Sequence, residues 1–431
     1  MGRRPHDQHV PGAGYHTELT LQGRSTNVFL EALMRRNRAS NLMASAVTLL
    51  TLCVTPGAAQ ELSWSGQVRP RFEFRDPVGD GASEAFTSMR SRLALMMRAE
   101  RGLSIFIQPQ DVRVWGGESH PLFDYSADGF DLHQGYLRLN PESVSWLTAT
   151  IGRAESNLGG QRLIGSVDWV AQGQSFDGVR LEAEAGRTQW TVLAFQINDA
   201  VDPDITQDQT LFGVYTTVRD VGPGALDVYW LNDRLSSTDN SEHLLGGRYV
   251  LPGAVTGRAE ATIARGTRSG DDVAAYMLGV RVGTRFAEDR LSATLWYDYL
   301  SGDDPGTPET EVFNTLFATN HKFYGFADLF LNIPANTGGA GLQDLAAKLG
   351  WTFSDRTNAS MDIHTFRAAA AASLTSSHFG EEIDLYVGHR YSAQLAGSIG
   401  FSQVFQAAGL EEIGRLDGDM TWLYVMLNAT F

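Results

Sequence analysis

Polarity alternates residue by residue along most of the chain, and this period of two constrains the fold more than any other feature. In one early segment the even positions Trp64, Val68 and Phe72 are apolar, whereas odd positions such as Arg69 and Glu73 are charged. The same pattern recurs at 89–99, 179–185 and 291–299. A period of two is that of a β-strand with one apolar and one polar face. Because no helical pattern of comparable length is found, an all-β fold is predicted.

The connections between these segments decide which all-β fold is expected. About eighteen segments follow one another, each roughly 9 to 14 residues long, which suits strands that cross a bilayer at a tilt. Short links are expected at 100–102, 140–143, 186–187, 287–289, 354–356 and 391–392, and long links at 115–130, 154–176, 198–209, 302–341 and 368–380. Short turns on one rim and long loops on the other predict a transmembrane antiparallel outer-membrane β-barrel of about 18 strands.

The last segment fits the same fold. Leu423, Val425 and the terminal Phe431 share one face of an alternating strand. An even number of strands returns the chain to the side on which it began, so both termini are predicted to lie in the periplasm. Two prolines fall within predicted strands, at Pro70 and Pro109, and a bulge is expected at each because proline removes a ladder donor.

A large secreted β-sandwich, such as a lectin-like domain, is the alternative fold. Its inner face should be apolar, but here charged residues alternate with apolar ones on nearly every segment. Composition excludes other classes of protein. The chain has 431 residues and a formal net charge of −16, so it lacks the phosphate-neutralising charge on which nucleic-acid binding depends. No nucleic-acid partner is therefore expected, and the lipid bilayer is the surface that the apolar faces should meet.

The N-terminal region is predicted to be removed before the barrel forms. Arg35, Arg36 and Arg38 precede an apolar stretch at 42–54, and the small residues at 57–59 follow it, as in a secretory signal. Residues 34–59 are therefore predicted to be a signal peptide. Residues 1–33 are interpreted as a mis-called extension, with an unusually long signal n-region as the alternative. The mature barrel is expected to span 60–431 and to contain no cysteine, because Cys53 lies in the signal.

Particular stretches resemble the alginate-export family of outer-membrane channels. These are DLHQGYLRL at 131–139, IGRAESNLGGQRLIGSVDW at 151–169, SFDGVRL at 175–181, YDYLSGDD at 297–304, NTLFATNHKFYGFADLF at 314–330 and GEEIDLYV at 380–387. The resemblance implies an eighteen-stranded barrel and a pore lined by basic side chains, through which a polyuronate leaves the cell. Relatives commonly have GRQE where this chain has Ala154 after Arg153, and Gln174 stands at a position that is often basic.

Basic residues on the polar faces are the candidates for an anion path. Six lie on two adjacent segments and four lie on other segments: Arg69, Arg71, Arg75, Arg90, Arg92 and Arg98; Arg138, Arg180, Arg281 and Lys348. Arg153 is carried over from the family motif, and Arg162 lies in the loop that follows it. Guanidinium groups match carboxylates in geometry and would offer a polyuronate successive weak sites. The alternative is that these residues pair with lumenal acids and stiffen the barrel: Glu73, Glu182, Glu184, Asp298, Asp344 and Asp384. A mixture of both arrangements is expected.

Arg153 and Arg162 are expected at different places in the barrel. Arg153 shares the parity of Ala149 and Ile151, which points toward lipid, so a rim or bulged position is expected for it. Arg162, in the following loop, is expected to fold inward. The alternative for both is an ordered surface loop held by Asp168 and Asp177.

The long link at 302–341 is the candidate gate. It carries His321, Lys322, Phe323 and Tyr324 among small and polar residues. Loops of more than about 15 residues in compact proteins are usually functional or disordered, and this one is too aromatic for disorder. It is predicted to fold over or into the mouth of the barrel as a gate or constriction, with a protective lid that has no role in transport as the alternative.

Catalytic and metal motifs are weak. No HExxH or GxSxG pattern is found, and the acids Asp199, Asp202, Asp204 and Asp208 lack the glycine and final glutamate of a calcium loop. Neither an enzyme, nor a metal site, nor a cofactor is therefore predicted. The expected function is export of an anionic, alginate-like exopolysaccharide together with periplasmic secretion partners. The alternative is a passive porin for small anions such as sugar acids.

Overall fold

The computed structural model describes residues 61–78, 82–117, 129–199, 208–235, 240–370 and 374–431. The predicted extension and signal peptide lie outside the described residues. The barrel belongs to a compact unit that spans Ala58–Phe431. No helix within the described segments is long and apolar enough to cross a membrane.

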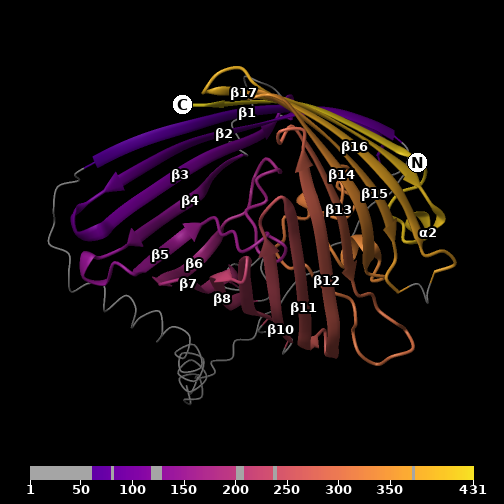
Figure 1. The fold of residues 1–431 in the computed structure, drawn as a ribbon, viewed down its shortest axis with the longest axis horizontal. Coiled ribbons are helices and arrows are strands. Elements are labelled where there is room, and N and C mark those ends of the chain that lie inside the picture. The colour runs from indigo at the N-terminus through magenta and orange to yellow at the C-terminus, as the bar shows by residue number, and fades with distance from the viewer. Residues whose placement is uncertain (1–60, 79–81, 118–128, 200–207, 236–239, 371–373) are drawn as a thin grey trace, which may run out of the picture. The chain divides into compact units, whose positions relative to one another are not determined.

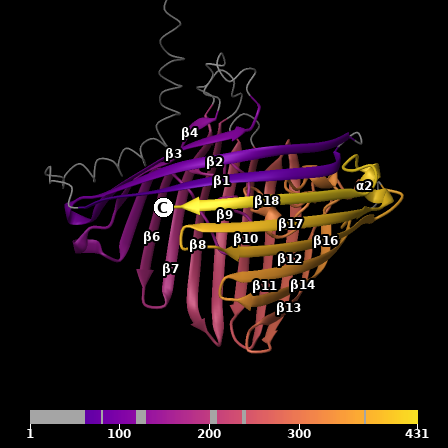
Figure 2. The same ribbon diagram turned by 90° about the horizontal axis from the view of Figure 1, so that it is seen from above.

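Eighteen antiparallel strands form one closed sheet (Figure 1). They are β1 (Glu61–Val78), β2 (Ala82–Arg98), β3 (Leu103–Val114), β4 (Phe130–Leu139), β5 (Leu147–Ala154), β6 (Phe176–Ala185), β7 (Thr188–Asn198), β8 (Gln209–Val221), β9 (Gly224–Leu235), β10 (Asn240–Leu251), β11 (Val255–Arg268), β12 (Asp271–Phe286), β13 (Leu291–Leu300), β14 (Leu342–Ser354), β15 (Thr357–Arg367), β16 (His378–Arg390), β17 (Leu395–Gln406) and β18 (Met420–Thr430). Each strand pairs with its neighbours in sequence, and β18 lies between β17 and β1, which closes the ring (Figure 2). The predicted all-β antiparallel barrel of about 18 strands is confirmed.

Helical elements in the described part of the chain are few and short. They are η1 (Glu100–Gly102), η2 (Glu142–Val144), η3 (Asn320–Lys322), η4 (Ala335–Thr337) and α2 (Ala408–Glu412). None of these described elements exceeds five residues. They lie in the connections, so the strands alone build the wall.

The two faces of the wall have opposite character, as the alternation predicts. On β1 the side chain of Phe72 faces outward and is 40% exposed, whereas its neighbour Glu73 faces the lumen and is 1% exposed. The same inversion holds for Leu93 (50% exposed) and Arg92 (9% exposed) on β2. An exposed apolar band around a polar interior is what a barrel in lipid requires.

The connections sort onto two rims. All six links predicted to be short join an even-numbered strand to the next one, and all five predicted to be long join an odd-numbered strand to the next. In an antiparallel ring these two sets lie at opposite ends. Both Glu61 and Phe431 lie at the short-turn end, where the amide of Gly66 donates to the Phe431 carbonyl at 2.9 Å.

The two strand prolines behave differently. At Pro109 the register between β3 and β4 shifts, which confirms the expected bulge. At Pro70 the expected bulge is wrong, because Pro70 pairs in register with Met89 of β2. On the β18 side, paired residues are found at Val68 and Arg71 but not between them. The missing donor therefore interrupts one ladder without inserting an extra residue.

Two of the long loops fold into the barrel instead of away from it (Figure 1). We call residues 155–175 the first inward loop and residues 301–341 the second inward loop. Phe313, Phe323, Phe330 and Ile333 of the second loop are at most 1% exposed and join one apolar cluster with inward side chains of the wall. The apolar core of this chain is therefore made jointly by the loops and by apolar side chains that the wall directs inward, such as Leu211 and Leu244.

Candidate functional site: a lumenal constriction

The two inward loops are bonded directly to one another. The amide of Gly165 donates to the carbonyl of Phe317 at 2.9 Å, and the amide of Phe317 donates to the carbonyl of Leu163 at 2.9 Å. The amide of Thr319 donates to the carbonyl of Gln161 at 3.0 Å. These bonds form a short parallel bridge between segments about 150 residues apart in sequence. The loops therefore form one joined structure within the lumen.

Gln174 reinforces this joint. Its side-chain amide donates to the carbonyl of Gly165 at 2.7 Å and to that of Phe317 at 3.0 Å. One side chain therefore bonds to both inward loops. The amide is well suited to two acceptors because it carries two hydrogens.

Arg162 fixes the joined loops to the wall. It is 2% exposed, and its guanidinium pairs with both oxygens of Asp298 on β13, at 2.8 and 3.0 Å. It also donates to the hydroxyl of Tyr324 at 2.9 Å and lies 4.2 Å over the Phe323 ring. Although burial acts to lower the pKa of Arg162, Asp298, Tyr324 and Glu260 together raise it above its usual value. The arginine is therefore a permanent cation that draws both family motifs together.

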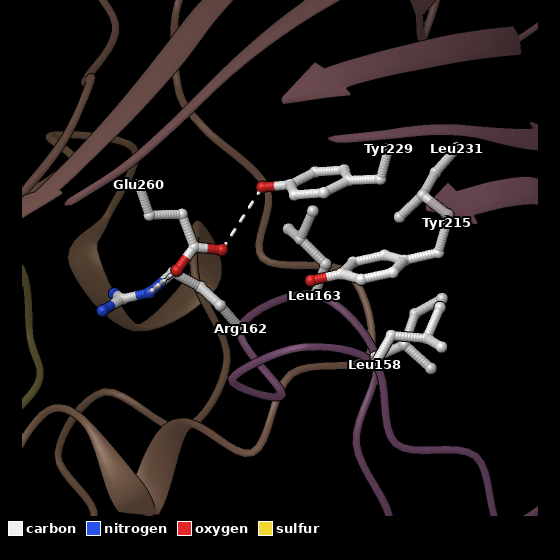
Figure 3. A pocket seen from close by; sticks show the side chains of 8 residues that line it. Leu158, Arg162, Leu163, Tyr215, Tyr229, Leu231 and Glu260 are labelled. Atoms are coloured by element: carbon white, nitrogen blue, oxygen red, sulfur yellow. Dashed lines mark hydrogen bonds and ion pairs between the residues drawn. The ribbon is translucent and has the colours of Figure 1, made fainter. Parts of the chain in front are cut away.

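A small pocket lies beside this arginine (Figure 3). Arg162 reaches Glu260 of β11 at 3.6 Å, and the hydroxyl of Tyr229 donates to the same carboxylate at 3.3 Å. The Tyr229 ring stacks on that of Tyr215, with 5.3 Å between the ring centroids. The loop therefore contacts three further strands, β8, β9 and β11.

The second inward loop has its own attachment to β16. Gly325 has a φ of 84° and lies so close to Glu382 that a Cβ atom would collide with its carboxylate. This approach lets the amide of Ala327 donate to Glu382 at 2.7 Å and the amide of Phe326 donate to Asp384 at 3.2 Å. Glycine is required here because the left-handed backbone and the close contact both exclude a side chain.

The predicted gate residues sit at the inner part of this loop. His321 stacks on Trp169 of the first inward loop at 4.1 Å and bonds to Asp328 at 2.6 Å. Phe323 and Tyr324 are buried beside Arg162, whereas Lys322 is exposed. Of the four, Lys322 is therefore the one that presents a charge to open space.

Four of the predicted arginines lie beneath the first inward loop. We call Arg69, Arg71, Arg90 and Arg92 the β1–β2 arginines, and each is between 1% and 9% exposed. They donate to backbone carbonyls of the loop: Arg69 to Asp168 at 2.7 Å, Arg71 to Trp169 at 2.7 Å, Arg90 to Asp168 at 3.3 Å and Arg92 to Gln172 at 3.2 Å. These side chains hold the loop against the wall.

The predicted pairing with lumenal acids is found for several residues. Glu73 receives Arg71 at 2.8 Å and Arg75 at 3.2 Å. The other acids of the predicted set each bind a cationic or polar partner: Asp298 binds Arg162, Glu182 binds Arg180, Glu184 binds Arg219, Asp344 binds His364 and Asp384 binds Ser402. The structure thus places many of these charges in pairs on the wall.

Three of the predicted arginines lie away from the constriction. Arg98 pairs with Glu61 at 3.0 Å at the short-turn rim, and Arg138 is exposed near the end of β4. Arg153 pairs with Asp177 at 2.7 Å, and both residues lie on the outward parity near the long-loop rim. The strand continues through Gly152 without a change of register, so Arg153 keeps the outward parity of Ile151. Its assignment to the anion path is therefore corrected, whereas the expected rim position fits.

A second set of cations lines the lumen on the other side. We call it the cationic arc: Arg180 on β6, Arg248 on β10, Arg258 on β11, Arg281 on β12, Lys348 on β14 and Lys322 of the second inward loop. Four members have an acid nearby: Arg180 has Glu182 at 3.5 Å, Arg248 has Asp227 at 2.6 Å, Arg258 has Glu260 at 3.4 Å and Lys348 has Asp362 at 2.5 Å. Within the described residues, Arg281 and Lys322 have no ion pair.

The centre of the arc places like charges face to face. Arg258 and Arg281 are directly opposite one another in the β11–β12 ladder. Such pairs are unfavourable unless an anion or a π-face compensates them. Arg281 lies over the Trp296 ring and 5.1 Å from the Phe323 ring. Partial burial of its amine lowers the pKa of Lys322 below its usual value, and the neighbouring cations Arg258 and Arg281 lower it further.

Sequence reasoning missed Arg248 and Arg258. Both lie on the inward parity of their strands, so the alternation itself contained the signal. A cavity of about 420 Å³ adjoins one end of the arc and is lined by Arg180, Glu155, Thr191 and Tyr215 among others. No group of three or more His, Cys, Asp or Glu side chains in the described part of the chain is arranged to hold a metal ion. The predicted acidic loop at 199–208 lies largely outside the described residues.

Several solved structures share this fold, among them the outer membrane protein OpdK of Pseudomonas aeruginosa. The structure is similar to OccAB4 of Acinetobacter baumannii, with a TM-score of 0.61 and 12% identity over 88% of this chain and 100% of that one. It is also similar to OpdO of Pseudomonas aeruginosa, with a TM-score of 0.61 and 12% identity over 86% of this chain and 98% of that one. OccK2 (OpdF) of P. aeruginosa, solved in complex with glucuronate, has a TM-score of 0.59 and 14% identity over 87% and 99% of the two chains. At these identities the likeness establishes the fold alone.

A search of curated protein sequences finds no match. The family model described as alginate export matches residues 60–405, which cover most of the chain. The fold is that of an outer-membrane channel. Two of the segments that carry the resemblance, 151–169 and 314–330, meet in the lumen around Arg162. The chain therefore belongs to the alginate export family.

Proposed function

We propose that this outer-membrane channel passes carboxylate-bearing sugars and that the cationic arc is their path. The observation that carries the proposal is the Arg258–Arg281 pair, in which two cations face each other and Glu260 lies 3.4 Å from Arg258. Arg281 and Lys322 have no ion pair within the described residues, and Lys322 is exposed, so these cations together make the lumen attractive to a mobile anion. A charged lumen of low dielectric concentrates counter-ions and speeds their entry.

The first candidate cargo is an anionic, alginate-like exopolysaccharide that leaves the cell. Membership of the alginate export family supports this cargo. The arc spreads its cations over strands β6 to β14, so a polymer would meet successive weak sites instead of one trap. In this case the joined inward loops act as a constriction that periplasmic secretion partners relieve during export.

The second candidate is passive diffusion of small sugar acids. It is favoured by the firm attachment of the two inward loops, because the Arg162–Asp298 pair and the Gln174 bonds hold the constriction in place. A similar fold has been solved with glucuronate bound, in OccK2 (OpdF). A constriction that stays in place suits monomers better than a polymer.

Planar-bilayer recording of the purified channel tests the function and separates the two cargoes. An anion-selective current supports the proposal, whereas a cation-selective current that polymannuronate does not block contradicts it. If polymannuronate blocks the current at a lower concentration of uronate units than glucuronate requires, polymer export is favoured. A steady current that is reduced by glucuronate and not by the polymer favours the porin.

We also propose that the short-turn rim, with both chain ends, faces the periplasm. The sorting of loop lengths supports this orientation, since barrels of this class carry short periplasmic turns and longer extracellular loops. An epitope tag placed between Asp304 and Thr307, at an exposed part of the second inward loop, should be labelled on intact cells. A tag after Phe431 should be labelled only after the outer membrane is opened, and the reverse result contradicts the orientation.

A further inference from the structure

The β1–β2 arginines surround a carboxylate that the chain itself provides. One oxygen of Asp168 lies 2.8 Å from Arg90 Nη2 and 3.6 Å from Arg92 Nη1, and the other lies 3.7 Å from Arg69 Nη1. The three guanidinium groups are almost fully buried, with side-chain exposures of 1% to 7%, whereas the Asp168 side chain is 61% exposed. A carboxylate therefore sits at the boundary between open space and a buried group of three cations.

The arginines are held in position by bonds that do not involve this carboxylate. Arg69 donates to the backbone carbonyls of Asp168 and Val170, at 2.7 and 3.0 Å. Arg92 donates to the side chain of Gln110 at 3.0 Å, and Arg90 donates to that of Gln67 at 2.9 Å. The site should therefore keep its shape when the Asp168 side chain rotates away.

Charge balance requires some anion at this place. Arg69 and Arg90 are directly opposite each other in the β1–β2 ladder, and like charges in that position repel. A buried cation without a counter-ion is strongly unfavourable. Glu155 lies 3.5 Å from Arg92, whereas Asp168 is the acid that pairs with Arg69 and Arg90. Any departure of the Asp168 carboxylate from these two cations must therefore be an exchange of one anion for another.

We propose that Asp168 is an internal substitute for the carboxylate of the cargo. Its side chain occupies a carboxylate site made by Arg69, Arg90 and Arg92, and a uronate carboxylate binds at the same three guanidinium groups when Asp168 swings toward the lumen. The inference rests on the proposed function, because it assigns the cargo class to a second site opposite the cationic arc. Asp168 then sets how much cargo is needed to occupy the site, because cargo must compete with a carboxylate that is always present.

The test compares Asp168→Asn with wild type by the glucuronate concentration that halves the single-channel current. Asparagine keeps the backbone carbonyl that Arg69 binds and removes only the competing charge. The half-blocking concentration should fall by about tenfold, since close charge pairs of this kind are worth at least that factor. Asp177→Asn is the matched control, because it removes the same charge from an acid on the outward parity and should leave the current unchanged.

Equal half-blocking concentrations in wild type and Asp168→Asn overturn the inference. If wild type is cation-selective, the proposed function fails. If wild type is anion-selective and the half-blocking concentrations of wild type and variant are equal, the inference alone fails.

Refolding yield supplies an answer that is independent of current. An Asp168→Asn chain should refold better with glucuronate than with uncharged glucose, while wild type should not distinguish them. A variant that refolds equally in both sugars also overturns the inference.

Discussion

Two pairs of arginines face each other across neighbouring strands, and the barrel treats them in opposite ways. Arg69 and Arg90 are opposite on β1–β2, and Arg258 and Arg281 are opposite on β11–β12. The first pair is covered by the first inward loop, whose carbonyls and Asp168 satisfy it. In the second pair Arg258 has Glu260 at 3.4 Å, and Arg281 lies over the Trp296 ring and near the Phe323 ring.

The difference shows that an inward arginine in a barrel has two possible roles. Where a loop supplies acceptors, the arginine becomes part of the structure and holds that loop. Where no loop supplies them, its charge remains available in the lumen. Substitutions can test this distinction, and Arg162, which attaches the inward loops to the wall, comes first.

Replacing Arg162 with alanine should have the largest effect. Asp298 is 0% exposed and would be left as an uncompensated buried charge, which costs roughly 3 to 5 kcal/mol of the free energy of unfolding. Urea titration of the refolded barrel in micelles should show this loss, and channel current should rise as the inward loops detach from the wall. The double variant Arg162→Met with Asp298→Leu is the control and should recover most of the stability. A single variant as stable as wild type would remove Arg162 from its central position.

Replacing Arg90 with glutamine should destabilise the barrel and leave the selectivity for small inorganic ions nearly unchanged, because the Asp168 carboxylate occupies the site when no uronate is present. The guanidinium is 1% exposed, but its partner Asp168 is open to solvent, so the expected loss is about 2 kcal/mol, below that of a fully buried pair. The measurements are the urea midpoint and the reversal potential in a salt gradient. A large change of reversal potential with unchanged stability would show that the β1–β2 arginines are part of the ion path.

Replacing Arg281 with glutamine should have the opposite result. The side chain has no ion pair within the described residues and faces Arg258, so its removal should change the free energy of unfolding by less than about 1 kcal/mol. The anion-to-cation permeability ratio should fall by about twofold or more, because one lumenal charge is lost. Arg98→Gln, at the exposed short-turn rim, is the matched control and should alter neither quantity. If Arg281→Gln conducts like wild type, the cationic arc is not the path.

Replacing Gln174 with alanine should have the smallest effect. It removes two hydrogen bonds between the inward loops, and the expected cost is roughly 1 to 2 kcal/mol. Hydrogen exchange should quicken at the amides of Gly165 and Phe317, which form the bridge between the loops. Current noise should increase without a change of selectivity, because no charge is altered. Unchanged exchange at these amides would contradict the assigned joint.

Much of the site was predictable because parity follows from local sequence. The inward positions of Arg69, Arg71, Arg90, Arg92 and Arg281 follow from alternation alone. Arg248 and Arg258 carry the same signal and were overlooked. Arg153 was assigned to the path through its family motif although its own parity pointed outward, and the structure supports the parity.

The roles of Asp168, Trp169 and Gln174 were not predictable in the same way. Their long-range partners Arg90, Asp328 and Phe317 are separated from them by about 80 to 160 residues, so no local pattern connects them. Whether an inward arginine is covered depends on where the first inward loop comes to rest, which is a tertiary property.

By itself the sequence determined the closed eighteen-stranded sheet, the apolar outer face and the separation of short turns from long loops. These follow from a period of two and from turn residues, both of which act within about ten residues of chain. Only the tertiary structure decided which charges are bound and which are free. The reason is physical: a lumenal arginine is neutralised by whatever folds against it, and here that depends on two loops meeting inside the barrel.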